Sequence, residues 1–160
     1  MLTGAVVLSG GTRRWVMVSS NVPPVEVVKK YRFVAVVGAS KSPEKEAFTV
    51  PAYLQRNGFK IVPVNPTADM IHGERAFPSL SSLPDDLAKK VEIVEVFRPS
   101  EELPLVAAQV VEMKKKTGRP FVFWAQQGIE NEDAKKTLSS AGVDYVMDAC
   151  MRTIHQLYGH

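Results

Sequence analysis

The sequence predicts a single α/β domain: a doubly wound, mostly parallel sheet of five or slightly more strands, with helices on both faces. Short apolar runs alternate five times with segments of helical character, which is the pattern of parallel strands joined by crossover helices. The runs are apolar along their whole length, as expected where both faces of a sheet are covered. The chain has 160 residues, enough to bury a core without disulfides or metal.

Residues 1–22 are predicted to form an N-terminal extension and residues 23–160 the domain. The extension carries Gly10-Gly11 and Arg13-Arg14 without a helical or strand period. A weakly ordered segment is the preferred interpretation, and a short extra strand or a contact arm is the alternative.

The first half of the domain predicts two strands and two helices. A helix runs from Pro24 to Tyr31, with proline in its first turn, where the missing N–H costs nothing. The strand Phe33–Val37 follows. A helix capped by Thr49 runs to Arg56 and stops at Asn57-Gly58, and Lys60–Val64 is the second strand.

The second half repeats this alternation. The long helix is capped by Ser100, has acidic residues in its first turn and three lysines in its last, and stops at Gly118. The expected elements, in order, are a turn with a short edge strand (71–77), a helix (85–90), a strand (91–97), the long helix (100–116), a strand (120–124), a helix (131–141), a strand (144–147) and a terminal helix (152–158).

Charge and cysteine content exclude several classes of protein. The net charge of +3 arises within residues 1–30, where four basic side chains face one acidic, and residues 31–160 hold 16 of each. A neutral body argues against nucleic acid as a partner. No apolar run approaches the ~20 residues that span a membrane. The single cysteine, Cys150, fits a reducing cytoplasm.

Ligands of such sheets bind beyond the carboxyl ends of the strands, so the residues after each strand are the candidates. They are Gly38-Ala39-Ser40-Lys41-Ser42, Asn65-Pro66, Arg98-Pro99-Ser100, Ala125-Gln126-Gln127-Gly128 and Asp148-Ala149-Cys150.

The first loop has features of a phosphate site, whereas the second lacks the carboxylate of an NAD site. Gly38 and its small neighbours would let backbone N–H groups approach a phosphate, with Lys41 and Lys45 adding charge; a structural turn with solvated lysines is the alternative. NAD enzymes place an Asp or Glu near the end of the second strand to bind the ribose. Here Asn65 occupies that place and no carboxylate follows before Asp69, although Asn-Pro also simply ends strands.

Arg98 and Cys150 each admit two interpretations. The Arg98 guanidinium, beside a helix start, would grip a phosphate or carboxylate, or would pair with Glu101 or Glu102. Cys150 follows the fifth strand and would form a mixed disulfide with a thiol ligand, or would be a buried packing residue.

The sequence predicts a binder rather than a catalyst. The histidines, His72, His155 and His160, do not follow strands, and no metal-ligand spacing, nucleophile elbow or Walker motif is present. We therefore expect no catalytic residues and no metal.

From about Val34 to Cys150 the chain resembles the stand-alone CoA-binding proteins, which share the Rossmann-like CoA-binding domain of the succinyl-CoA synthetase α subunit and of ADP-forming acyl-CoA synthetases. The motifs are Val37-Gly38-Ala39-Ser40, Tyr53-Leu54 before Gly58-Phe59, Val62-Pro63-Val64-Asn65-Pro66, Ile71-His72-Gly73, Val96-Phe97-Arg98, Gln126-Gln127-Gly128-Ile129 and Asp148-Ala149-Cys150-Met151.

The resemblance implies coenzyme A, bound across the strand ends. It places the pyrophosphate on the loop from Gly38 to Ser42, the adenosine near Val64, Asn65 and Pro66, and the pantetheine arm near Phe97, Arg98 and Pro99. In the synthetases the loop matching Gln127-Gly128-Ile129 begins a helix that stabilises a phosphohistidine. Gln127 replaces their acidic residue and the histidine-supplying domain is absent, so no ligase reaction is expected.

Coenzyme A also accounts for the missing carboxylate. Its ribose carries a 3′-phosphate, which an acidic residue would repel and which Lys41, Lys45 or Arg98 would attract. The expected site residues are Gly38, Ala39, Ser40, Lys41, Ser42, Lys45, Val64, Asn65, Pro66, Phe97, Arg98, Pro99, Gln126, Gly128 and Cys150.

The predicted function is binding of CoA or an acyl-CoA without self-contained catalysis. Three alternatives stay open: an NAD(P)-linked oxidoreductase, a CoA-binding component of an acyl-CoA synthetase that needs a separate catalytic chain, and an interaction domain that has lost its ligand. The apolar-rich, neutral body and the N-terminal segment are compatible with a homodimer.

Overall fold

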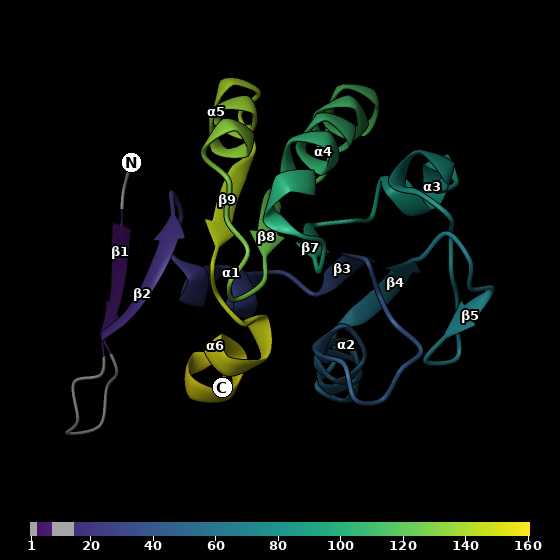
Figure 1. Ribbon diagram of the computed structural model, residues 1–160, viewed down its shortest axis with the longest axis horizontal. Helices are drawn as coiled ribbons and strands as arrows, with labels where there is room; N and C mark the ends of the chain where they lie inside the picture. The colour runs from purple at the N-terminus through teal and green to yellow at the C-terminus, as the bar shows by residue number, and fades with distance from the viewer. Residues whose placement is uncertain (1–2, 8–14) are drawn as a thin grey trace.

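The computed structural model describes residues 3–7 and 15–160 and contains a sheet of seven strands in the order β1-β2-β9-β8-β7-β3-β4 (Figure 1). The strands are β1 (Thr3–Val7), β2 (Trp15–Ser20), β3 (Phe33–Val37), β4 (Lys60–Val64), β7 (Ile93–Val96), β8 (Val122–Ala125) and β9 (Asp144–Met147). A small separate hairpin joins β5 (Met70–Ile71) to β6 (Glu74–Arg75).

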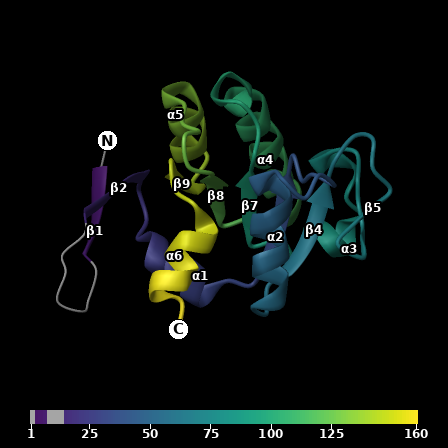
Figure 2. The ribbon, with the colours of Figure 1, turned by 60° about the horizontal axis from the view of Figure 1, so that its bottom comes forward.

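The helices divide between the two faces of the sheet, which confirms the doubly wound α/β prediction (Figures 1 and 2). They are α1 (Pro24–Lys30), α2 (Glu46–Arg56) and α6 (Met151–Tyr158) on one face, and α3 (Asp85–Ala88), α4 (Leu103–Thr117) and α5 (Glu132–Ser140) on the other. Two short 3₁₀ turns, η1 (Leu80–Ser82) and η2 (Ser100–Glu102), precede α3 and α4.

The buried core forms two layers because successive strand residues point to opposite faces. Ala35 and Val37 of β3 pack with the residues under α3, α4 and α5. Val34 and Val36 of the same strand pack with those under α1, α2 and α6. These strands are buried on both faces, which explains their continuous apolar sequence.

The position of the site follows from the strand order. Strands β4, β3, β7, β8 and β9 run parallel. In this sheet β3 lies between β4 and β7, which are the next two strands of the same sheet along the chain. The helices after β3 and β7 therefore leave toward opposite faces (Figure 1). The carboxyl ends of β3 and β7 are therefore the topological switch point of the sheet, the place where ligands of such sheets bind.

The N-terminal segment differs from the preferred expectation of a weakly ordered extension. β2 pairs antiparallel with β9, and β1 pairs antiparallel with β2, so the short-strand alternative describes these residues. The Asn21 side chain fixes the junction, because its Oδ1 accepts a hydrogen bond from the Tyr145 backbone N–H at 2.7 Å. Residues 1–2 and 8–14 of the predicted extension lie outside the described residues.

Two predicted helix caps are wrong. Helix α2 begins at Glu46 with Lys45 as its N-cap, one turn before Thr49. The Ser100 hydroxyl does not cap the long helix: it lies in η2 and accepts a hydrogen bond from the Glu130 N–H at 3.1 Å. The predicted helix stops at Gly58 and Gly118 are confirmed by their positive φ values of 88° and 76°.

Candidate functional site

The five parallel strand ends are tied together at one edge of the sheet. The Gly38 N–H donates to the Val64 carbonyl at 3.0 Å, and the Phe97 N–H donates to the Val37 carbonyl at 2.9 Å. Gly38 has a φ of +85°, and a Cβ at this position would lie 3.2 Å from the Phe97 carbonyl oxygen. Only glycine therefore allows the first loop to approach the end of β7 this closely.

The first loop turns sharply from Ala39 into helix α2. The Ser42 N–H donates to the Ser40 hydroxyl at 3.0 Å, and the Ser40 N–H donates to the Ala47 carbonyl at 3.1 Å. Lys41 and Lys45 are exposed, and in the described part of the chain neither lies within 4 Å of a carboxylate. Two lysines without an ion-pair partner in the described chain thus flank a small-residue turn at a helix start, which favours an anion, although Glu44 and Glu46 are the chain neighbours of Lys45.

The Asn65 side chain holds the second loop to the first. Its Nδ2 donates to the Ala39 carbonyl at 2.9 Å, while its Oδ1 accepts from the N–H groups of Thr67 at 2.8 Å and Ala68 at 3.0 Å. The buried Val64 precedes it and the exposed Pro66 follows. Asn65 therefore positions the backbone of both loops, and an aspartate could not donate to Ala39.

Arg98 stands at the switch point but is engaged with a neighbour. Its Nη2 lies 2.9 and 3.0 Å from the two carboxylate oxygens of Glu102, which is the ion-pair interpretation considered from the sequence. The Arg98 and Glu102 side chains are 46% and 37% exposed, and ion pairs open to solvent contribute only about 0–1 kcal/mol. A ligand phosphate can therefore compete for Arg98. Phe97 beside it is half-buried and Pro99 is exposed.

The ends of β8 and β9 form a second linked group. The Gly128 N–H donates to the Asp148 carboxylate at 2.7 Å, and the Met151 N–H donates to the Gln126 Oε1 at 3.0 Å. Gln126 is buried, with its Nε2 unpartnered among the described residues. Cys150 is 7% exposed and is the N-cap residue of α6. This burial favours packing as its main role.

Sequence reasoning missed Glu95, at the centre of the sheet. Its side chain is fully buried in β7, pairs in register with Val36 and Trp124, and has neither carboxylate oxygen hydrogen-bonded within the described chain. Burial raises the pKa of this carboxyl well above its usual range, and the nearby Cys150 thiol raises it further. A lone acidic residue inside the apolar run Ile93–Val96 was the available signal.

The two internal histidines have structural partners. The His72 Nε2 donates a hydrogen bond to the Phe48 carbonyl at 2.9 Å. His155 is buried, and its Nδ1 lies 2.8 Å from the Tyr53 hydroxyl. Burial is the main cause that lowers the pKa of His155, with the charges of His160 and Arg32 adding to it. Within residues 3–7 and 15–160, no group of three His, Cys, Asp or Glu side chains is placed to hold a metal.

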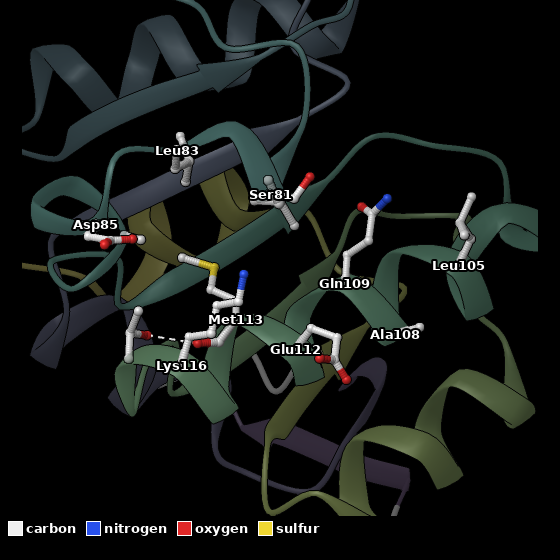
Figure 3. Close-up of a pocket in the computed structure, with 12 residues that line it drawn as sticks. Ser81, Leu83, Asp85, Leu105, Ala108, Gln109, Glu112, Met113 and Lys116 are labelled. Carbon is white, nitrogen blue, oxygen red and sulfur yellow. Dashed lines mark hydrogen bonds between the residues drawn. The ribbon is translucent and has the colours of Figure 1, made fainter.

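Two cavities lie beside the helices that cover the sheet. A cavity of about 260 Å³ lies between α4 and the segment of η1 and α3, with Met113 and Leu105 among its lining residues (Figure 3). A second, of about 410 Å³, lies between α2 and α6. Neither is lined by a predicted site residue. No described helix is long and apolar enough to cross a membrane.

The structure thus brings the predicted residues of all five loops to one edge, through the contacts of Gly38, Asn65 and Gln126. It also shows which side chains are already engaged. Asn65 and Arg98 have partners, Gln126 and Cys150 are buried, and Lys41 and Lys45 are exposed without partners among the described residues.

Known proteins share this fold and sequence. The uncharacterized protein YneT of Bacillus subtilis is 39% identical over 130 residues, covering 81% of this chain and 90% of that protein. A Thermus thermophilus protein of solved structure is 32% identical with a TM-score of 0.72, covering 82% of this chain and 92% of that one.

A third relative is much longer. The ADP-forming acetate–CoA ligase II of Archaeoglobus fulgidus is 38% identical over 78 residues, which is 48% of this chain but only 11% of the ligase.

A sequence profile of the CoA binding domain matches residues 32–156. This range contains the first loop, the Asn65 loop and the ends of β7, β8 and β9. It leaves out β1, β2 and α1. The chain therefore belongs to the CoA-binding domain family and is related to the CoA-binding part of ADP-forming acetyl-CoA synthetases.

Proposed function

We propose that this chain binds coenzyme A, free or acylated, across the carboxyl ends of β3, β4 and β7. The proposal rests mainly on the residue that follows β4. Asn65 stands there with its side chain committed to backbone groups, and no carboxylate occupies the place of an NAD-type ribose ligand. A 3′-phosphorylated ribose avoids charge repulsion there, whereas the ribose of NAD would lose its usual hydrogen-bond acceptor.

In this proposal each part of CoA lies against a different loop. The pyrophosphate lies on the turn from Gly38 to Ser42, where Lys41 and Lys45 are exposed, and the adenosine lies near Val64 to Pro66. The pantetheine arm passes Phe97, Arg98 and Pro99 toward Gln126 and Gly128. Membership of the CoA-binding family supports this path.

The proposed role is binding without turnover. Among the described residues the internal histidines are hydrogen-bonded within the fold, and Glu95 is sealed inside the sheet. A CoA-binding component of an acyl-CoA synthetase is the second candidate function, favoured by the match to the acetate–CoA ligase. It would require a separate catalytic chain.

A cytoplasmic location and a homodimer belong to the same proposal. The free Cys150 fits a reducing compartment. Strand β1 ends the sheet, and an edge strand is a ready surface for pairing with a second chain. Light scattering should then give twice the 17.6 kDa mass of one chain, and a value of one chain would contradict the dimer.

Thermal unfolding with a ligand series tests the binding proposal. CoA and acetyl-CoA should stabilise the protein by about 2.7 kcal/mol at a hundredfold excess over the dissociation constant, and NAD and NADP should not. Lys41→Ala should weaken the binding of CoA and of 3′-dephospho-CoA alike, because both carry the pyrophosphate that this proposal places on the turn from Gly38 to Ser42. Lys90→Ala, an exposed lysine just before the amino end of β7, is the matched control. Stabilisation by NAD without any by CoA would contradict the proposal.

A further inference from the structure

Helices α2 and α6 contact each other on the face of the sheet opposite α4 (Figure 2). A polar groove lies between these two helices. Its volume is about 410 Å³. Its lining is basic, hydroxylic and aromatic in character and consists of Phe48, Thr49, Ala52, Tyr53, Arg56, Arg152 and Gln156. The function proposed above uses none of these residues.

Hydrogen-bond donors converge in this groove. The Arg152 Nη1 lies 3.3 Å from the Thr49 hydroxyl, so the guanidinium of α6 reaches across to α2. The charge of Arg152 also acts on the Tyr53 hydroxyl, whose pKa burial raises and this charge lowers. The Tyr53 hydroxyl is anchored by the His155 Nδ1 at 2.8 Å.

The groove carries positive charge without a counter-charge. No acidic residue lines it, and among the described residues neither Arg56 nor Arg152 lies within 4 Å of a carboxylate. Arg98 and Arg119, by contrast, have Glu102 and Glu92 as partners. Two guanidinium groups in one concave site favour an anion that accepts several hydrogen bonds.

We propose that the groove between α2 and α6 binds a phosphate group. Arg152 and the Thr49 hydroxyl contact its oxygens from the inner side and Arg56 approaches from the exposed side. A tetrahedral phosphate offers acceptors in several directions, which suits donors arriving from two helices.

Two sources can supply this phosphate. Helix α2 follows the Gly38–Ser42 loop and α6 begins directly after Cys150, so both helices start at the strand-end edge. The 3′-phosphate of bound CoA is one source, and in that case the inference rests on the proposed function. A separate phosphorylated small molecule is the other, and it requires no CoA.

Nuclear magnetic resonance of the ¹⁵N-labelled full chain tests the site with inorganic phosphate as the probe. Phosphate should shift the Arg152 side-chain and Thr49 backbone signals in a saturable way, and Arg152→Gln should weaken the affinity about tenfold, the effect of losing one charge-assisted hydrogen bond. Arg119→Gln removes the same charge beside β8 and should leave the affinity unchanged. Unshifted Thr49 and Arg152 signals, or equal effects of both variants, would overturn the inference. Unfolding curves of both variants establish that they are folded.

Calorimetry with CoA and 3′-dephospho-CoA identifies the source. If Arg152→Gln weakens CoA alone and CoA blocks the phosphate shifts, the 3′-phosphate occupies the groove. If phosphate still shifts Arg152 in the CoA-saturated protein, the groove serves a separate ligand. If CoA does not bind but phosphate does, the proposed function fails and this inference stands.

Discussion

Glu95 is an acidic residue whose side chain is fully buried. A carboxyl that is fully buried and has no hydrogen-bond partner among the described residues loses its hydration without compensation. The protein reduces this cost by favouring the protonated form, because burial raises the carboxyl pKa well above its ordinary value near 4.5. Stability must therefore depend on pH through this residue.

The folded-state pKa of Glu95 lies above the unfolded-state pKa, so its contribution is complete below about pH 4.5 and is lost as pH rises toward the folded value. Glu95→Gln removes this titration and should make the protein more stable than wild type at pH 8. Urea unfolding of both proteins at pH 5 and pH 8 measures the difference. Asp144→Asn, at the exposed start of β9, is the control. An identical pH dependence in wild type and Glu95→Gln would refute this account of the carboxyl.

Asn65 shows what the sequence could and could not establish about a residue. Its position after β4 follows from the apolar run that precedes it, and the absence of a carboxylate is visible in the sequence. Its hydrogen bond to Ala39 joins loops 26 residues apart. No local pattern encodes such a contact, because it depends on the pairing of β3 with β4.

At the scale of elements, the first loop depends on the close approach of Gly38 to the end of β7. Gly38→Ala should destabilise the fold and weaken CoA binding, because a Cβ would meet the Arg98 Cδ at 3.0 Å and the Phe97 carbonyl oxygen at 3.2 Å. Gly58→Ala is a matched control. It has a similar φ of +88° but open space around its Cβ position.

Both substitutions incur the cost of a left-handed alanine, about 1–2 kcal/mol, and only Gly38→Ala should lose more than this. Denaturant unfolding measures the stability and calorimetry measures the CoA affinity. Equal losses of stability in the two variants, with CoA affinity preserved in both, would show that the contact between the loop and β7 is unimportant.

Elements were predictable where a local pattern determines them. Strands β3, β4 and β9 have the predicted bounds, because each is an apolar run between turn residues. The predicted caps at Thr49 and Ser100 were wrong because a hydroxyl near a helix start can also accept hydrogen bonds from distant parts of the chain. Ser100 bonds to Glu130 instead, 30 residues along the chain. The Arg98–Glu102 ion pair was one of the two interpretations of Arg98 from the sequence, because the two residues are four positions apart.

For the whole molecule, the fold class followed from the sequence, and so did the gathering of the predicted site loops at one edge of the sheet. Five alternating apolar runs predict a parallel sheet, and a parallel sheet gathers the loops after its strands. The antiparallel addition of β2 to β9 was only the less favoured alternative. That pairing depends on a contact between residues more than 100 positions apart, which no periodicity reveals.

We propose that the ligand of this strand-end edge is coenzyme A rather than a nicotinamide dinucleotide. Isothermal titration calorimetry of the full chain with CoA, followed by NAD under the same buffer conditions, tests it most directly. We predict saturable binding of one CoA per chain and an affinity for NAD at least about tenfold weaker, a difference of about 1.4 kcal/mol. Binding of NAD as tightly as CoA, or no binding of CoA, would contradict it.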